Sequence, residues 1–200
     1  MGHRIVIVDN GGANVASLVY ALERLGHAAT LSADAGMIRA ASHVFLPGVG
    51  AAGDAMRRLR SHGLDEVIPG LTQPVLGICL GMQLLYESSA EDDTRCLGAI
   101  PGGGAVRLAA TVGRPVPHMG WNRIAPTRAT PLLDGVQPGE YAYFVHSYAV
   151  PLGAETVAST NYGSAFSAVV AHRNFHATQF HPERSARTGA ALLRNFLALH

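Results

Sequence analysis

The stretch Pro74-Val75-Leu76-Gly77-Ile78-Cys79-Leu80-Gly81-Met82-Gln83-Leu84-Leu85-Tyr86-Glu87 decides the fold class. It opens as a short apolar run typical of a strand buried in a parallel sheet, and it continues as a helical run. Between the two, Gly77-x-Cys79-x-Gly81 predicts a tight strand-to-helix turn that exposes the cysteine sulfur. The helix dipole favours a thiolate there. A cysteine packed between strand and helix explains this stretch equally well, so the rest of the chain must decide.

The composition indicates one globular domain over residues 1–200. The chain is 48% hydrophobic and 14% charged, with a formal net charge of +1. This balance provides no basic footprint for nucleic acid, and no apolar run reaches the roughly 18 residues of a membrane span. The apolar run at Arg4–Asp9 is too short for a signal peptide. We therefore expect a cytoplasmic protein that binds neither nucleic acid nor membrane, in which Cys79 and Cys96 are free thiols.

Strands and helices alternate through the first half of the chain. Expected strands at Arg4–Asp9, Ala28–Leu31, His43–Leu46 and the elbow alternate with helices capped by Asn14 and Asp54 and a further helix at Leu64–Ile68. After a loop-rich segment at Ser88–Gly104, the chain is mainly strand up to Phe180 and closes with a helix at Ala190–Leu199. The pattern predicts an α/β fold, an open, mostly parallel sheet with helices on both faces and an antiparallel strand extension.

A cysteine nucleophile needs a base, and the base needs a group that orients it. Phe180-His181-Pro182-Glu183 closes the last expected strand. Residues two apart in an extended chain point to one side, so Glu183 can hold His181 in one tautomer. Taken alone, this segment is more typical of a surface turn. Beside a cysteine elbow in an α/β chain, it indicates a catalytic base.

Attack on an amide also needs donors for the oxyanion. Pro47–Gly50 follows a strand, its glycines let backbone N–H groups approach a substrate, and the Leu80 N–H follows the nucleophile. The segment Gly48–Gly53 also matches the dinucleotide fingerprint G-x-G-x-x-G. The acids near the required spacing lie in an expected helix and not at a strand end, which argues against a nucleotide site.

Gln83 lies one helical turn after Cys79, and its amide can point back toward the sulfur to recognise a small amino acid; a solvent-facing glutamine is the alternative. His146 can line the same pocket. The ten histidines show no zinc spacing, and Cys96 has no histidine motif nearby.

Together these motifs resemble the class I glutamine amidotransferases of the Cys-His-Glu triad type, over nearly the whole chain. Within that family, Pro117–Asn122 and Tyr143–Tyr148 are similar to the glutaminase subunits of imidazole glycerol phosphate synthase. Asp9–Asn14 resembles the opening Asp-Tyr-Gly-x-Gly-Asn of those subunits, but Asn10 replaces the aromatic residue and Ala13 replaces a glycine. These departures leave the triad intact and concern how this loop meets a partner.

The resemblance implies a glutaminase that needs neither metal nor cofactor. Cys79 would attack L-glutamine, His181 would transfer protons, and Glu183 would orient His181. Ammonia would pass through a channel to a (β/α)8 barrel synthase subunit, and a peptide flip in Pro47–Gly50 would raise the activity. The implied oxyanion and substrate-binding residues are Gly48, Val49, Gly50, Leu80, Gln83, Ser147 and Tyr148. The implied partner interface comprises Asn10, Asn14, His118, Met119, Trp121 and Asn122.

Three alternatives remain. The chain could be the glutaminase of another pathway, such as anthranilate or pyridoxal phosphate synthesis, but Pro117–Asn122 argues against this. It could be a cysteine peptidase or another hydrolase of the same fold. It could also be a non-catalytic partner-binding module, which the intact Cys79, His181 and Glu183 disfavour.

Overall fold

The computed structural model describes residues 4–11 and 15–200. Its core is an eight-stranded sheet in the order β2-β1-β3-β4-β14-β13-β12-β9. The first five strands in this order are parallel and the last three pair antiparallel, which confirms the predicted fold class. The strands are β1 (Ile5–Val8), β2 (Ala29–Ser32), β3 (His43–Gly48), β4 (Val75–Cys79), β9 (Ala125–Pro126), β12 (Thr156–Tyr162), β13 (Ser164–His172) and β14 (Phe175–Thr178).

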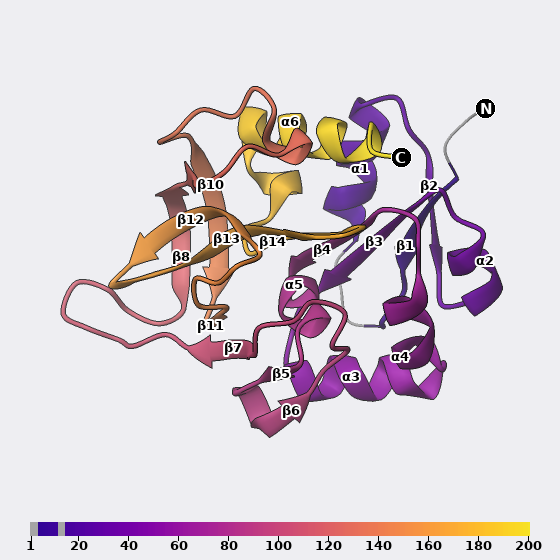
Figure 1. Ribbon diagram of the computed structural model, residues 1–200, viewed down its shortest axis with the longest axis horizontal. Helices are drawn as coiled ribbons and strands as arrows, with labels where there is room; N and C mark the ends of the chain where they lie inside the picture. The colour runs from indigo at the N-terminus through magenta and orange to yellow at the C-terminus, as the bar shows by residue number, and fades with distance from the viewer. Residues whose placement is uncertain (1–3, 12–14) are drawn as a thin grey trace.

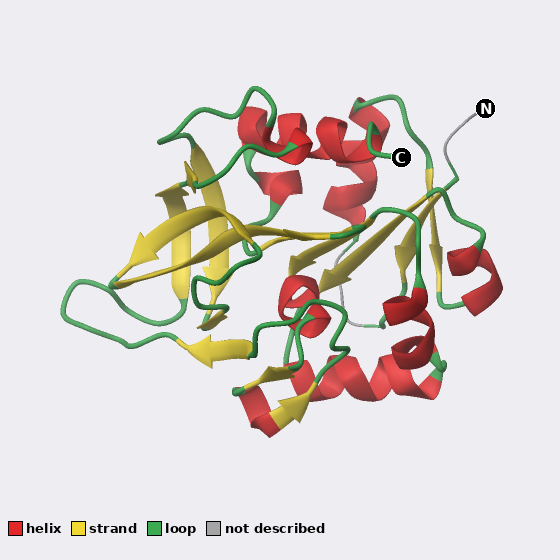
Figure 2. Ribbon diagram, viewed as in Figure 1, coloured by secondary structure: helices red, strands yellow, loops and turns green. Residues whose placement is uncertain are grey.

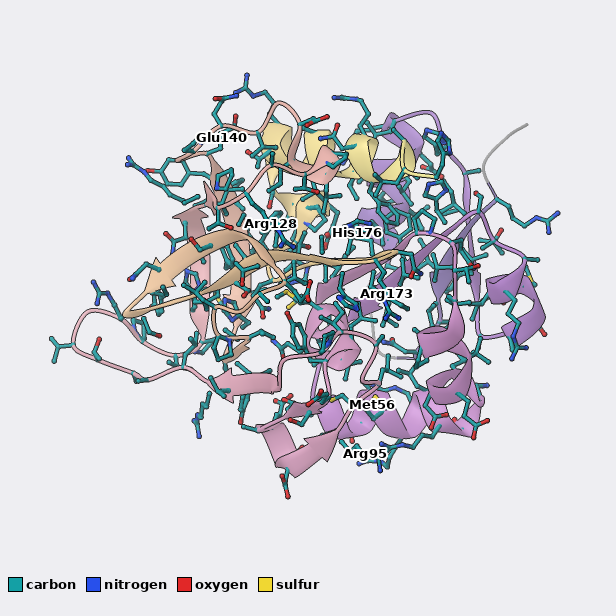
Figure 3. The ribbon with its side chains drawn as sticks, viewed as in Figure 1. Met56, Arg95, Arg128, Glu140, Arg173 and His176 are labelled. Atoms are coloured by element: carbon teal, nitrogen blue, oxygen red, sulfur yellow. The ribbon has the colours of Figure 1, made fainter. Side chains whose placement is uncertain are left out.

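Helices cover both faces of this sheet, as Figure 1 shows. One face buries α1 (Ala16–Arg24) and α6 (Ala186–Leu197), and the other buries α2 (Ala35–Arg39), α3 (Ala52–Ser61), α4 (Leu64–Val67) and α5 (Leu80–Leu85). The split follows the alternation along the strands, because Ile5 and Ile7 of β1 belong to the first core and Val6 and Val8 to the second. Met56 of α3 is buried in the second core, whereas Arg95 lies exposed at the rim (Figure 3).

Two smaller sheets extend the molecule beyond the main sheet (Figure 2). A two-stranded sheet pairs β8 (His118–Arg123) with β10 (Tyr141–His146). A four-stranded sheet joins β5 (Ser88–Ser89), β6 (Thr94–Arg95), β7 (Gly104–Arg107) and β11 (Tyr148–Ala149). Short 3-10 turns complete the chain: η1 (Ile68–Gly70), η2 (Glu91–Asp93), η3 (Pro131–Leu133) and η4 (Pro182–Arg184). Because β10 and β11 are separated only by Ser147, the two small sheets meet there.

Two helix starts differ from what the sequence predicted. The sequence predicted Asp54 as a helix cap, but α3 begins earlier, and Asp54 lies in its first turn in an ion pair with Arg57. The first N–H of α3, from Ala52, instead donates to Glu91 Oε2 at 2.8 Å, so a side chain 39 residues away satisfies the helix start. Helix α2 was not predicted from the sequence; Asp34 caps it by accepting from the Met37 N–H. The predicted cap Asn14 lies outside the described residues.

None of the helices in residues 4–11 and 15–200 combines the length and apolar character that a bilayer-spanning segment requires.

Candidate active site

Cys79 stands on a strained turn between β4 and α5. Its backbone has φ 55° and ψ −111°, a conformation that a non-glycine residue adopts only where the surrounding structure holds it. Two glycines make the turn possible. A Cβ at Gly81 would lie 1.8 Å from the Leu46 carbonyl oxygen in β3, and a Cβ at Gly77 would lie 2.8 Å from the Gly81 carbonyl oxygen. The helix therefore starts directly against the sheet, and the sulfur stands at the carboxyl edge of β4.

The base lies opposite the sulfur. His181 Nδ1 is 2.8 Å from Glu183 Oε1, and both side chains are largely buried. Burial alone would lower the pKa of His181, but hydrogen bonding and charge from Cys79 and Glu183 raise it to about 10. The imidazolium is therefore favoured between the two groups. This arrangement can accept a proton from a thiol and deliver it to a leaving group.

A buried serine fixes the backbone of this base to strand β10. The His181 N–H donates to the Tyr143 carbonyl at 3.0 Å. The Tyr143 N–H donates to Ser185 Oγ at 3.0 Å, and the Ser185 hydroxyl donates to the His181 carbonyl at 2.7 Å. His181 and Tyr143 are therefore joined by one direct backbone hydrogen bond and by one bridge through the Ser185 hydroxyl. Ser185 was not predicted from the sequence.

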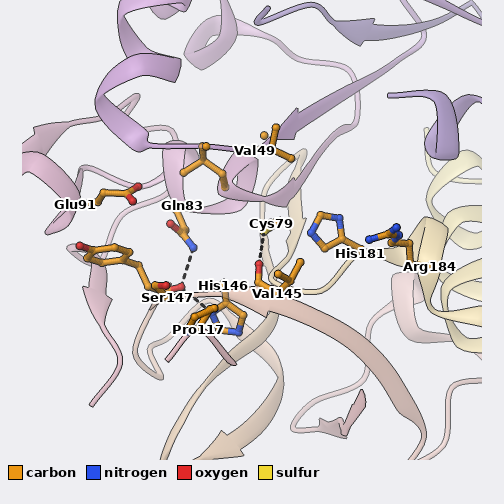
Figure 4. Close-up of a pocket in the computed structure, with 14 residues that line it drawn as sticks. Val49, Cys79, Gln83, Glu91, Pro117, Val145, His146, Ser147, His181 and Arg184 are labelled. Atoms are coloured by element: carbon orange, nitrogen blue, oxygen red, sulfur yellow. Dashed lines mark hydrogen bonds between the residues drawn. The ribbon is translucent and has the colours of Figure 1, made fainter. Parts of the chain in front are cut away.

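Cys79 and His181 open into a cavity of about 370 Å³ (Figure 4). A cavity of this size suits a small ligand. The structure brings all seven predicted oxyanion and substrate-binding residues to its wall: Gly48, Val49, Gly50, Leu80, Gln83, Ser147 and Tyr148. It adds Glu91, Pro117, Val145 and Arg184, which were not predicted as site residues, and His146, which was expected there. Pro117 and Val145 lie within the segments Pro117–Asn122 and Tyr143–Tyr148 that carry the family resemblance, and Glu91 lies in an acidic run.

The glycines of the Pro47–Gly50 loop serve different purposes. A Cβ at Gly48 would lie 2.8 Å from both the Gly81 nitrogen and the Leu80 Cβ, so this glycine permits close contact with the elbow. Gly50 has φ +83°, where side chains are strained. The loop is tied at both ends, because Asn10 Nδ2 donates to the Pro47 carbonyl at 2.9 Å and Glu91 accepts from Ala52 beyond it.

Gln83 is buried and not solvent-facing. Its Nε2 donates to the Tyr148 carbonyl at 2.8 Å and to Gln179 Oε1 at 3.0 Å. Gln179 Nε2 in turn donates to Cys79 Sγ at 3.8 Å, and the sulfur lies 3.7 Å from the Val145 carbonyl oxygen. The predicted link between Gln83 and the sulfur therefore runs through Gln179, two residues before His181, which the sequence analysis did not identify.

Two buried histidines lie at the cavity: His146 lines its wall, and His118 lies behind His146. His146 Nδ1 is 2.8 Å from the Tyr148 carbonyl oxygen, and His118 Nδ1 is 3.0 Å from His146 Nε2. His118 also stacks between Phe144 and Tyr162. Burial lowers the pKa of His118 to about 4 and is the main cause that lowers the pKa of His146 to about 3. Both rings are therefore neutral near pH 7.

The residues predicted at a partner interface separate into surface and interior positions. Met119 and Trp121 are 63% and 53% exposed on one face of β8. Asn122 is half-buried, and its Nδ2 donates to the Asn161 carbonyl at 3.0 Å. Asn10 and His118 are buried within the chain, so the prediction that their side chains meet a partner differs from this structure. Asn14 lies outside the described residues.

Within residues 4–11 and 15–200, no cluster of three or more His, Cys, Asp or Glu side chains is arranged to hold a metal ion.

The chain is similar to known proteins over nearly its whole length. Residues 6–199 match the family Glutamine amidotransferase class-I. The chain is 52% identical over 196 residues to the imidazole glycerol phosphate synthase subunit HisH of Xanthomonas axonopodis pv. citri (strain 306), covering 98% of this chain and 97% of that protein. It is 46% identical over 205 residues to the subunit of the same name from Vibrio cholerae, covering 100% of both.

Solved structures show the same fold. One crystal structure of a glutamine amidotransferase aligns with a TM-score of 0.74 at 19% identity, covering 96% of each chain. The structure of PurLQS from Thermotoga maritima aligns with a TM-score of 0.73 at 18% identity, covering 98% of each chain.

Proposed function

The chain belongs to the class I glutamine amidotransferases, and from this membership we propose that it is the glutaminase subunit of an imidazole glycerol phosphate synthase in histidine biosynthesis. It hydrolyses L-glutamine to glutamate and ammonia and passes the ammonia to a synthase subunit. The observation that carries this proposal is the geometry around Cys79, with His181 and Glu183 opposite the sulfur at a cavity of about 370 Å³. Full-length relatives that are synthase subunits support it.

The reaction follows from the positions of the proton carriers. The Cys79 thiolate attacks the side-chain amide carbon of glutamine, and the carbonyl oxygen becomes an oxyanion near the Gly50 and Leu80 N–H groups. The His181 imidazolium then gives its proton to the leaving nitrogen, which departs as ammonia and leaves a glutamyl thioester. Neutral His181 takes a proton from water, the hydroxide attacks the thioester, and glutamate leaves while Cys79 returns to its starting state. Glu183 holds the ring throughout.

The cavity also offers groups that suit the main-chain ends of glutamine. Glu91 presents a carboxylate, which pairs with an α-ammonium group. Gln83 has both amide N–H groups engaged, and its Oε1 atom has no hydrogen-bond partner among the described residues, so this oxygen accepts from the same ammonium. Ser147 also lines the wall, and its backbone groups are available to the substrate carboxylate.

The exposed face of the β8–β10 sheet is the docking surface for the synthase subunit, a (β/α)8 barrel. Met119, Trp121 and Arg123 pair with Val145, Tyr143 and Tyr141 across the two strands. Trp121 packs edge-to-face on Tyr143, and the Arg123 guanidinium lies 5.3 Å from the centre of the Tyr141 ring. Large aromatic side chains carry much of the binding energy of interfaces. Val145 also lines the cavity, so ammonia released at Cys79 emerges beside this surface, where a partner shields it from protonation in water.

The test mixes this chain with the barrel subunit and its ribonucleotide ligand and measures glutamate. We expect stimulated hydrolysis that Cys79→Ala abolishes without loss of complex formation. Trp121→Ala should weaken assembly by about tenfold or more, whereas Leu31→Ala, at a similarly exposed position on the edge strand β2 of the main sheet, should not. Absence of stimulation would contradict the assignment to this synthase, and wild-type affinity of Trp121→Ala would contradict the docking surface.

A further inference from the structure

We propose that His146, held in place by His118, is a positioning residue that orients the Gln83 amide for glutamine binding. This inference rests on the proposed glutaminase function and adds a substrate-positioning role to two residues outside the triad. We call the series Asn122–His118–His146–Tyr148 carbonyl the histidine relay. It runs from β8, on the partner-facing sheet, to the wall of the cavity.

The chemistry of the terminal group sets the direction of every hydrogen bond in the relay. The Tyr148 carbonyl can only accept, so His146 Nδ1 carries a proton and donates to it at 2.8 Å. His146 is neutral, so its Nε2 accepts from His118 Nδ1–H at 3.0 Å. His118 Nε2 then accepts from Asn122 Nδ2 at 3.3 Å. Each ring therefore has one tautomer, with the proton on Nδ1.

The relay acts on the substrate site through the Tyr148 carbonyl. This oxygen receives two hydrogen bonds, from His146 and from Gln83 Nε2, each 2.8 Å long. A carbonyl oxygen has two lone pairs, so it has no acceptor capacity left for a ligand. Its role is to hold Gln83. The second N–H of that amide is committed to Gln179, so the Gln83 oxygen is the atom turned to the cavity (Figure 4).

The surroundings make this arrangement rigid. His146 packs edge-to-face on Phe166 at 5.1 Å, and His118 stacks on Tyr162 at 4.0 Å. Both side chains are nearly inaccessible to solvent, so the hydrogen bonds of the relay are made within the protein. Removal of the His146 ring would take away one of the two hydrogen bonds that fix the direction of the Tyr148 carbonyl. The Gln83 amide would then be held less firmly in the orientation that presents its oxygen.

The first experiment measures glutamine affinity and turnover of the complex. We expect His146→Ala to raise KM for glutamine by about tenfold, with kcat changed less than about threefold, because substrate orientation suffers and the triad does not. His146→Asn retains an N–H near the Nδ1 position and should recover most of the loss. His176→Ala, which removes a half-buried imidazole outside the relay, should leave KM unchanged. A wild-type KM in His146→Ala, or equal losses in His176→Ala and His146→Ala, would overturn the proposal.

The second experiment does not require activity or a variant that folds. Nitrogen-15 NMR of the wild-type imidazoles at pH 7 should show the Nδ1–H tautomer for both His118 and His146. The Nε2–H tautomer at His146 would overturn the relay, because that ring could not donate to Tyr148. If the wild-type complex hydrolyses no glutamine, the proposed function fails by itself, and the tautomers still decide whether the relay exists.

Discussion

Replacement of Gly81 by alanine should displace the turn that holds Cys79. The new Cβ would lie 1.8 Å from the Leu46 carbonyl oxygen, and ordinary contact begins at 3.4 Å. Helix α5 and strand β3 would therefore have to separate by about 1.6 Å, the difference between these distances. Both neighbours are backbone, so no side chain can rotate away to relieve the clash.

The energetic cost follows from this overlap. Overpacking of a rigid site costs about 1–3 kcal/mol, and an overlap with backbone belongs at or above the upper end of that range. The higher helix propensity of alanine returns about 1 kcal/mol. The free energy of unfolding should therefore fall by about 2 kcal/mol or more. A shift of about 1 Å in a reacting group can reduce turnover by about 100-fold, so glutamine hydrolysis should fall at least as far.

Urea unfolding and glutamate formation in the presence of the proposed barrel subunit measure both effects. Gly53→Ala is the matched control, because Gly53 also lies in a helix but its nearest neighbours are side-chain oxygens at 3.5 Å and 3.6 Å. This control should keep its activity and gain less than about 1 kcal/mol of stability. If Gly81→Ala unfolds at the wild-type urea concentration and retains wild-type turnover, the elbow does not depend on this contact.

Three further predictions concern the groups around the base. Glu183→Gln should lower the pKa of His181 from its raised value, since a stabilising charge is removed, and an NMR titration of the ring that shows no decrease would contradict this. Ser185→Ala should cost about 1–3 kcal/mol of stability by leaving the Tyr143 N–H unsatisfied, and should reduce kcat more than it raises KM for glutamine; unchanged kinetics would remove Ser185 as an anchor of the base. The free energy of unfolding should be greatest near pH 6.5, the pKa of histidine in the unfolded chain. His181, with its folded pKa of about 10, stabilises the fold fully below pH 6.5, and this contribution is lost as the pH rises toward 10. The buried relay histidines and His176, with lowered folded pKa values, lose their contributions as the pH falls toward 4 and below. Chemical unfolding at successive pH values measures this profile, and a monotonic dependence between pH 4 and 10 would contradict it.

The site residues that could be predicted are those that belong to short local patterns in the sequence. Gly77-x-Cys79-x-Gly81 and His181-x-Glu183 are local patterns, and the structure places them together because parallel strands end at one edge of a sheet. The buried strands could be predicted for the same reason, since an alternating or unbroken run of apolar residues is visible over a few positions.

The residues that were not predictable act across long separations. Glu91 completes the start of α3 from 39 residues away, and Gln179 reaches the sulfur from 100 residues away. His118 occupies a segment whose pattern predicts a partner contact, yet its ring is enclosed by Phe144 and Tyr162. Side chains alternate along β8, so Met119 and Trp121 point to solvent and His118 points to the interior. The sequence shows this alternation, but only the pairing with β10 shows which set is buried.

Strand β10 links the docking surface to the catalytic geometry because one strand serves both. The side chains of Tyr141 and Tyr143 stand toward the surface that we assign to the synthase subunit. The Tyr143 backbone anchors His181 directly and through Ser185, and the Val145 carbonyl lies against the Cys79 sulfur. A partner that shifts β10 therefore changes the environments of the nucleophile and the base together. Such a coupling needs no separate signalling element, since the strand that the partner contacts also holds the reacting groups in register.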